Sequence, residues 1–293
     1  MDCTMILAET FPDILRTDVP LGLMTSFGIG GVARRFIQPR TIEELAVVVA
    51  QFNKSGTRFR ILGGGTNLLI KSREITEPVV CLGKLRALSL DGERVRVEAG
   101  MPLGRLVTRC GREGLAGIEA LAGIPGTLGG ALMMNSGGRH GWIGEVVSEV
   151  TCVDAGGLTT LPAEKICFAY RDSGLRGRVV AAAELLLKRA DAAGIAMRRG
   201  AVLAEKRRSQ PLTAKSAGCV FRNPPGQYAG QLIEAAGFKG ARVGGAMVSP
   251  LHANFIINTG GATADDVLRL IEKIREKILK NYNVLLELEI EIW

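Results

Sequence analysis

Three consecutive glycines followed by two polar residues form the first pattern in this sequence with chemical meaning. They are Gly63, Gly64, Gly65, Thr66 and Asn67. Residues without a Cβ leave successive backbone N–H groups open, and the threonine and asparagine add side-chain donors. The pattern therefore predicts a phosphate-binding loop, although a plain glycine turn would explain it equally well. The Gly-Lys-Ser/Thr ending of nucleoside triphosphatase loops is absent, which excludes that class.

A second and denser glycine cluster covers residues 123–138. Its apolar residues lie between glycines and not in a helical stripe, so a flat, extended ligand could lie against the backbone. A buried glycine-rich loop and a bent helix are the alternatives. A Gly-x-Gly-x-x-Ala run at residues 28–33 matches a dinucleotide fingerprint by letter. It lacks the preceding apolar strand and the later acidic residue, which disfavours a Rossmann site.

The composition of the 293-residue chain limits what it could bind. It has 38 glycines but only 2 Trp, 3 Tyr and 9 Phe, and its net charge of +8 favours an anionic ligand. Nucleic-acid binding is not expected, because single-strand binders interleave basic residues with aromatic ones. The six cysteines show neither metal-binding nor disulfide spacing, and no apolar run of 18 residues occurs. We expect a cytoplasmic protein without a metal site, membrane insertion or an obligate protein partner.

Capping residues and hydrophobic periodicity predict a mixture of helices and strands around the glycine clusters. A capping box of Thr41 and Glu44 predicts a helix ending near Lys54, and Thr263 caps an amphipathic helix. Another helix is expected over residues 103–112, and the basic stretch 188–210 predicts a lobe boundary that is partly helical. Strands are expected over residues 58–62, 79–82, 88–90, 95–97, 150–153, 158–161, 179–187 and, by strict alternation, 284–292.

Several ordered motifs resemble those of the UDP-N-acetylenolpyruvoylglucosamine reductase family, from about residue 20 to residue 292. They lie at residues 27–31, 62–67, 123–130, 134–135, 170–173, 210–211, 217–224, 230–234, 252–258 and 286–289. One such motif would be weak, but their order makes the resemblance specific. The chain looks like the compact subtype, since it lacks an extra tyrosine-bearing segment before Gln210.

The resemblance implies an α+β protein with an FAD-binding fold like that of vanillyl-alcohol oxidase and p-cresol methylhydroxylase. It implies FAD-binding lobes over residues 1–75 and 76–200. A smaller α+β substrate lobe would follow over residues 201–293, with its final strand, 284–292, carrying a catalytic glutamate. NADPH would reduce the FAD, which would pass hydride to the enolpyruvyl double bond of UDP-N-acetylglucosamine enolpyruvate. The product would be UDP-N-acetylmuramate, a peptidoglycan precursor used in cell-wall synthesis.

The family's catalytic positions fall on three residues of different chemistry. Arg171 would stabilise the enolate-like charge that hydride addition creates on the substrate carboxylate, because guanidinium stays charged and binds carboxylates through two bonds. Cys219 would donate the proton, where many members have serine; a thiol, with a pKa of about 8.5, is the stronger acid. Glu289 would supply a carboxylate that either supports the Arg171 site or protonates the intermediate, with Glu287 in reserve.

The resemblance also assigns binding residues for FAD and for the UDP-sugar enolpyruvyl ether. Tyr170 and Asn223 would contact the substrate. The pyrophosphate and ring of FAD would lie against Gly63, Gly64, Gly65, Thr66, Asn67, Gly123, Ile124, Pro125, Gly126, Thr127, Gly129, Gly130 and Asn135.

Two alternative functions remain possible for the sequence. A covalent-flavin oxidase of the same fold would tether its cofactor, with His140 and His252 the only histidines available. A non-catalytic basic protein would instead bind nucleic acid or a sugar nucleotide through Lys206, Arg207 and Arg208.

Overall fold

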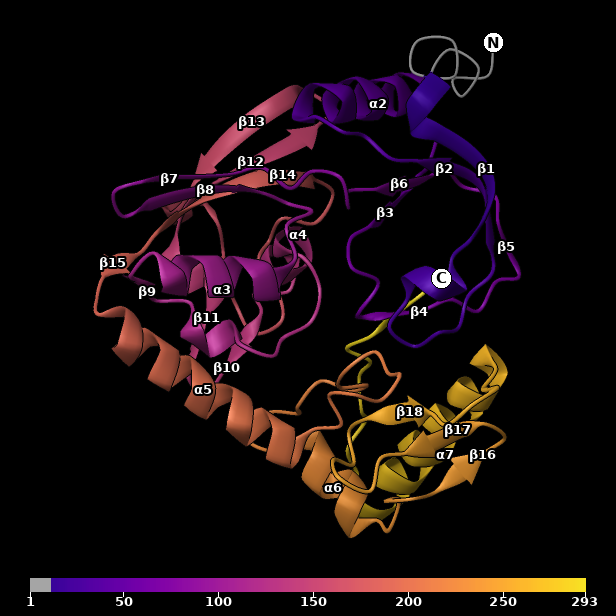
Figure 1. The fold of residues 1–293 in the computed structure, drawn as a ribbon. Helices are drawn as coiled ribbons and strands as arrows, with labels where there is room; N and C mark the ends of the chain where they lie inside the picture. Colours follow the sequence, from indigo (N-terminus) through magenta and orange to yellow (C-terminus); the bar gives the residue numbers. More distant parts are fainter. Residues whose placement is uncertain (1–11) are drawn as a thin grey trace. The chain divides into compact units, whose positions relative to one another are not determined.

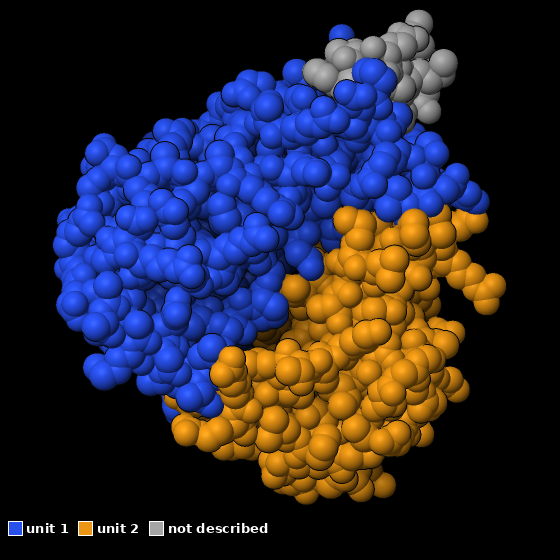
Figure 2. All heavy atoms as spheres, in the orientation of Figure 1, with its two compact units in different colours: residues 1–19, 33–64, 76–204 blue, residues 20–32, 65–75, 205–293 orange. Residues whose placement is uncertain are grey.

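The computed structural model describes residues 12–293, which form two compact units. Figure 2 colours them separately: unit 1 holds the described residues up to 19 with 33–64 and 76–204, and unit 2 holds 20–32, 65–75 and 205–293. Each unit therefore combines segments distant in the sequence. The three-lobe division expected from the sequence stays a prediction.

Unit 1 is built around an antiparallel five-stranded sheet (Figure 1). Its order is β13 (Gly157–Pro162), β12 (Val147–Asp154), β14 (Val179–Leu186), β8 (Arg94–Glu98) and β7 (Leu88–Asp91). A second sheet in this unit has the order β1 (Leu15–Pro20), β2 (Val32–Ile37), β6 (Val79–Cys81) and β3 (Arg60–Leu62). The short strand β5 (Glu74–Ile75) belongs to unit 2. In the second sheet, β2 and β3 both run parallel to β6. The strands expected here are confirmed to within a few residues.

Helices cover the antiparallel sheet, and their ends follow the sequence signals. Helix α2 (Ile42–Ser55) begins where Thr41 Oγ1 accepts the Glu44 N–H at 3.2 Å, and it ends at the left-handed Gly56. It packs on β12 and β13, while α4 (Leu128–Met133) packs on β14 and β8. Two further helices, α3 (Leu103–Arg112) and α5 (Ala192–Ser209), follow along the chain. Two small ladders pair β9 (Leu115–Ala116) with β15 (Lys188–Arg189) and β10 (Gly137–Gly138) with β11 (Gly141–Trp142).

Unit 2 packs a small antiparallel sheet against the long helix α7 (Ala264–Tyr282). The sheet contains β16 (Arg242–Val243), β17 (Ala246–Val248) and β18 (Ile256–Asn258), and α6 (Ala229–Ala235) lies beside α7. The apolar face predicted for α7, namely Val267, Ile271, Ile274 and Ile278, is buried in the core. Within residues 12–293, no helix has both the length and the apolar character needed to cross a bilayer.

The last strand is much shorter than its alternating sequence predicts. Only β19 (Glu291–Ile292) forms a ladder, in parallel with β4 (Leu68–Leu69), and a single bridge joins Leu288 to Phe221. The expected strand over 284–292 is therefore wrong in extent, because neighbouring segments supply backbone partners at only these points. The alternation survives in burial, since Leu286 and Ile290 are buried and Glu287 is exposed.

Candidate functional site

The two glycine clusters meet in unit 1. A Cβ built on Gly63 would lie 2.8 Å from Thr127 Oγ1, and one on Gly64 would lie 2.8 Å from Gly126 Cα. Only glycine allows the two loops to approach this closely. We call Gly63, Gly64, Gly126 and Thr127 the glycine cradle.

Thr127 gives the glycine cradle an unsatisfied polar atom. It occupies the N-cap position of α4, yet its side chain makes no capping bond. Its Oγ1 is buried and has no hydrogen-bond partner among the described residues. A buried hydroxyl without a partner is costly, which favours a bound acceptor at this point. The cradle and this hydroxyl fit the pyrophosphate of a dinucleotide.

Most of the other predicted residues of the second cluster lie in two environments, a loop and a helix. Gly123 and Gly126 have left-handed backbones, and Ile124 and Pro125 lie in the loop between them. Gly129 and Gly130 belong to α4, and a Cβ on Gly129 would lie 3.0 Å from the Cβ of Ala99. Residues 128–133 of the second cluster are therefore helical, and Gly129 lets α4 pack closely.

The rest of the first cluster belongs to unit 2. A Cβ on Gly65 would lie 2.2 Å from the carbonyl oxygen of Met24. Asn67 Nδ2 donates to the carbonyl of Glu289 at 3.0 Å, and the Glu291 N–H donates to the carbonyl of Asn67 at 2.9 Å. Thr66 lies between Gly65 and Asn67. The run Gly63–Asn67, expected as one loop, thus contributes to both units, and the amide of Asn67 supports the segment that carries Glu289.

Arg171 lies on a two-residue turn of unit 1. Ala169 and Asp172 close the turn with backbone bonds of 2.9 and 3.3 Å, and Arg171 itself has φ +56°. Its guanidinium carbon lies 5.5 Å from the ring centre of Tyr170 and 5.7 Å from that of Trp142. Two aromatic faces therefore orient the cation. Sequence reasoning missed Trp142, although a tryptophan beside a glycine cluster in a chain with only two was an available signal.

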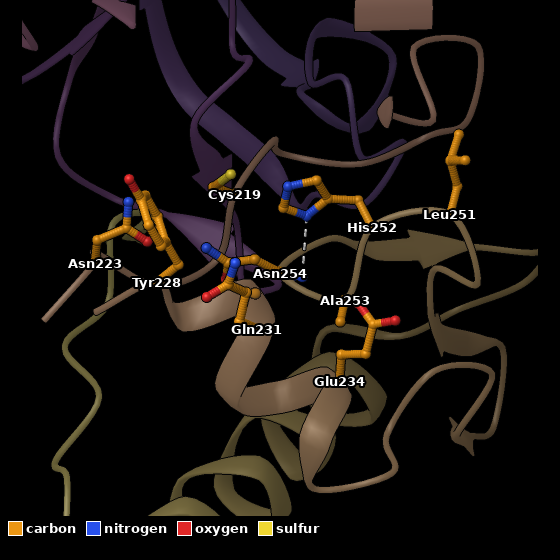
Figure 3. Close-up of a pocket in the computed structure, with 10 residues that line it drawn as sticks. Cys219, Asn223, Tyr228, Gln231, Glu234, Leu251, His252, Ala253 and Asn254 are labelled. Atoms are coloured by element: carbon orange, nitrogen blue, oxygen red, sulfur yellow. Dashed lines mark hydrogen bonds between the residues drawn. The ribbon is translucent and has the colours of Figure 1, made fainter. Parts of the chain in front are cut away.

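Cys219 lines a pocket of about 300 Å³ in unit 2 (Figure 3). The predicted substrate residue Asn223 lines it too. Sequence reasoning assigned no role to the other lining residues, Tyr228, Gly230, Gln231, Glu234, Leu251, His252, Ala253 and Asn254. Several of them belong to the motifs at residues 230–234 and 252–258, which was the available signal. The pocket combines polar side chains with the thiol, as a site for a polar ligand requires.

His252 is the titratable imidazole of this pocket. Burial is the main reason that its pKa is lowered, and the positive charge of Lys239 adds to the effect. Its Nδ1 accepts the Asn254 N–H at 3.2 Å, so the neutral ring carries its proton on Nε2. The pocket therefore presents a neutral hydrogen-bond donor.

The backbone around Cys219 is held from two sides. Cys219 bridges Phe255, and the buried amide of Asn254 accepts the Phe221 N–H at 2.9 Å and donates to the Phe221 carbonyl at 2.8 Å. On the other side the Glu289 N–H donates to the carbonyl of Val220 at 2.8 Å. Two of the three predicted catalytic residues, Cys219 and Glu289, are thus brought onto neighbouring segments of unit 2. Arg171 belongs to unit 1.

Cys219 differs from most of the other described cysteines. Burial raises the pKa of Cys81, that of Cys110 to about 12 and that of Cys152 to about 11. Cys219 is half-buried in a pocket, and Cys167 is exposed; Cys3 lies outside the described residues. Between residues 12 and 293, no group of three or more His, Cys, Asp or Glu could hold a metal ion.

Comparison with known proteins first defines the class. Residues 33–161 match the FAD binding domain family. A crystal structure of Phl p 4, a grass pollen allergen with glucose dehydrogenase activity, superposes with a TM-score of 0.53 at 20% identity, over 65% of this chain and 45% of that one. This likeness concerns the fold alone. The chain therefore contains an FAD-binding domain within an α+β fold, as the resemblance implied.

The C-terminal part and the full length then define the family. Residues 210–293 match the C-terminal domain of UDP-N-acetylenolpyruvoylglucosamine reductase. The reductase of Moorella thermoacetica is 40% identical over 298 residues, covering 100% of this chain and 99% of its own. The crystal structure of the Thermus caldophilus reductase has a TM-score of 0.84 at 38% identity, covering 95% and 99% of the two chains. The chain belongs to the UDP-N-acetylenolpyruvoylglucosamine reductase family, which confirms the resemblance seen in its motifs.

Proposed function

We propose that this chain catalyses the NADPH-dependent reduction of UDP-N-acetylglucosamine enolpyruvate to UDP-N-acetylmuramate, in the cytoplasm, for peptidoglycan precursor synthesis. The observation that carries the proposal is the match to reductases of this family over the full chain, together with a glycine cradle suited to a dinucleotide. FAD, when bound, supplies the two-electron chemistry that amino-acid side chains lack.

The glycine cradle would hold the cofactor pyrophosphate. Backbone N–H groups near Gly63, Gly64 and Gly126 can approach an anion because no Cβ intervenes, and the Thr127 hydroxyl gains the acceptor that residues 12–293 do not offer it. Further contacts are assigned, by motif alone, to Gly65, Thr66, Asn67, Gly123, Ile124, Pro125, Gly129 and Gly130.

Arg171 would bind the substrate carboxylate and stabilise the negative charge that develops when hydride is added to the terminal carbon. A cation already oriented before the reaction needs no reorganisation as the charge appears. The closed turn and the rings of Tyr170 and Trp142 supply that orientation. Tyr170 would in addition contact the substrate.

Cys219 would complete the reduction by proton transfer. The S–H bond breaks as a C–H bond forms at the carbon bearing the ether oxygen, and the resulting thiolate is reprotonated by solvent reaching the pocket. Asn223, in the same pocket, would contact the substrate. Glu289 is the better candidate for the supporting carboxylate, because it is half-buried next to Val220 whereas Glu287 is exposed.

The visible absorption spectrum of the purified protein tests this function. Under anaerobic conditions a yellow protein should bleach with NADPH and regain its colour with UDP-N-acetylglucosamine enolpyruvate. A protein that stays colourless after FAD reconstitution would contradict the flavoenzyme assignment. Reoxidation by oxygen alone, or flavin that stays attached after acid precipitation, would instead favour an oxidase of the same fold.

A further inference from the structure

Asn135 has a buried side chain whose two polar atoms both bond to backbone. It lies just beyond Met134, the C-cap of α4, has φ +40° and is only 7% exposed. Its Oδ1 accepts the Gly144 N–H at 3.1 Å, and its Nδ2 donates to the Ala169 carbonyl at 3.0 Å. The amide therefore connects the end of α4 to the turn that carries Arg171.

That turn requires support from outside. Arg171 occupies the position of a two-residue turn where a positive φ favours glycine or asparagine, and arginine adopts this conformation only when its surroundings impose it. Nδ2 of Asn135 bonds the carbonyl of Ala169, which closes the turn with Asp172. On the far side, the fully buried Ser173 donates through Oγ to the Met133 carbonyl at 3.2 Å.

Helix α4 thus has the glycine cradle at one end and the Arg171 turn at the other. It begins at Thr127 of the glycine cradle, and residues 133–135 at its other end hold both sides of the Arg171 turn. Gly144 completes the arrangement, because a Cβ there would lie 2.6 Å from the Phe168 ring. The same short helix connects the loop suited to a pyrophosphate with the cation suited to a carboxylate.

We propose that Asn135 is a positioning residue for Arg171. Its amide fixes the Ala169 carbonyl, and with it the left-handed turn that points the guanidinium. This inference rests on the function proposed above, and it gives Asn135 a different task from the cofactor contact that the resemblance implies. It predicts a defect confined to the half-reaction in which Arg171 takes part.

The variant Asn135→Asp tests this directly. Aspartate keeps the shape, the tolerance of positive φ and the acceptor for Gly144, but it places an oxygen against the Ala169 carbonyl. We expect reoxidation of the reduced enzyme by substrate to slow about 10- to 100-fold, as for a small misplacement of a catalytic group. FAD content and the rate of reduction by NADPH should not change. In an Arg171→Ala background the same substitution should have no further effect, because the group it positions is gone.

A second readout needs no turnover. Arg171 stacks on Trp142, so release of the turn should shift tryptophan emission of the apoprotein alike in Asn135→Asp and Arg171→Ala. Asn283→Asp is the matched control, since Asn283 is a left-handed asparagine at the exposed end of α7 in unit 2. It should leave emission and both half-reactions unchanged. Should Asn135→Asp fail to fold, Ser173→Ala removes the bond on the other side of the turn and should slow the same half-reaction.

Three results would overturn the proposal. Loss of FAD from Asn135→Asp would mean that Asn135 contacts the cofactor. Equal slowing of both half-reactions, or an effect that persists in the Arg171→Ala background, would mean that Asn135 has only a general structural role. Failure of the proposed function is distinguishable, because the unaltered protein would then not be reoxidised by the substrate at all, and the role of Asn135 would fall with it.

Discussion

The segments around Arg171 and Cys219 are held in contrasting ways. In unit 1, side chains of Asn135 and Ser173 bond to backbone, and two aromatic rings flank the guanidinium on a turn with a left-handed backbone. In unit 2, backbone segments on both sides hold the chain at Cys219, while the thiol itself borders a pocket. A stabilising charge must be oriented in advance. A proton donor must reach a substrate atom and afterwards regain its proton from solvent.

Removal of the oriented positive charge of Arg171 should cause the largest decrease in rate. Arg171→Ala should slow reoxidation by the substrate up to about 1,000-fold, the loss seen when one group that stabilises a developing oxyanion is removed. Arg171→Lys should recover only part of the rate, because it keeps the charge without the planar fork. Stopped-flow absorbance separates the half-reactions, and unchanged reoxidation in Arg171→Ala would disprove the role of this residue.

Loss of the proton donor should cause the second-largest decrease in rate. Cys219→Ala should slow product formation about 100-fold, a typical contribution of general acid catalysis, and leave reduction by NADPH intact. Cys219→Ser should keep substantial turnover. Rapid-quench analysis of product formation measures both variants. If Cys219→Ala slowed both half-reactions equally, the thiol would be a structural and not a chemical part of unit 2.

A smaller effect should distinguish the cofactor loops from the pocket. Gly64→Ala places a Cβ 2.8 Å from Gly126 Cα and should weaken FAD binding about tenfold, since overpacking costs roughly 1–3 kcal/mol. Gly104→Ala is the matched control, because no neighbouring atom of residues 12–293 lies within 4 Å of a Cβ at that position in α3. Titration of the apoproteins with FAD measures both affinities. Equal affinity of the two variants would remove the glycine cradle from the cofactor site.

The smallest effect concerns the pH dependence of unit 2. The pKa of His252 is lowered in the folded chain from 6.5, chiefly by burial, so the unfolded chain takes up the proton first as the pH falls. Between pH 7 and pH 5 the unaltered protein should therefore lose stability that His252→Gln retains. Urea denaturation over this range measures the difference, and parallel stability curves for the two proteins would contradict it.

Local signals predicted most elements well, but they predicted poorly the features that depend on contacts between distant residues. Capping residues located α2 and α7 closely, because those signals act within one helical turn. Alternation over residues 284–292 gave the right burial at Leu286, Glu287 and Ile290 but too long a strand, since a ladder needs a neighbour. The helical state of 128–133 depends on Gly129 packing against Ala99, a contact between residues far apart in sequence.

The motifs located the candidate residues but not their neighbours. Family spacing pointed to Arg171, Cys219 and Glu289, and the structure leaves their roles as proposals. The ring of Trp142 and the amide of Asn254 act through contacts with distant residues, Arg171 and Phe221, which no local pattern encodes. Asn135 and Asn67 lie in motifs that suggest ligand contact, yet their amides bond to the backbone at Ala169 and Glu289.

The division of unit 2 among three segments has a consequence for synthesis on the ribosome. Residues 20–32 emerge early, but the Phe27 carbonyl accepts a bond from Asn258, and β4 needs residues 291–292. Unit 2 therefore cannot be completed until residues 291–292 have left the ribosome, and its early segments must wait for these later partners. Most of unit 1 can form sooner, because all of its residues precede position 205.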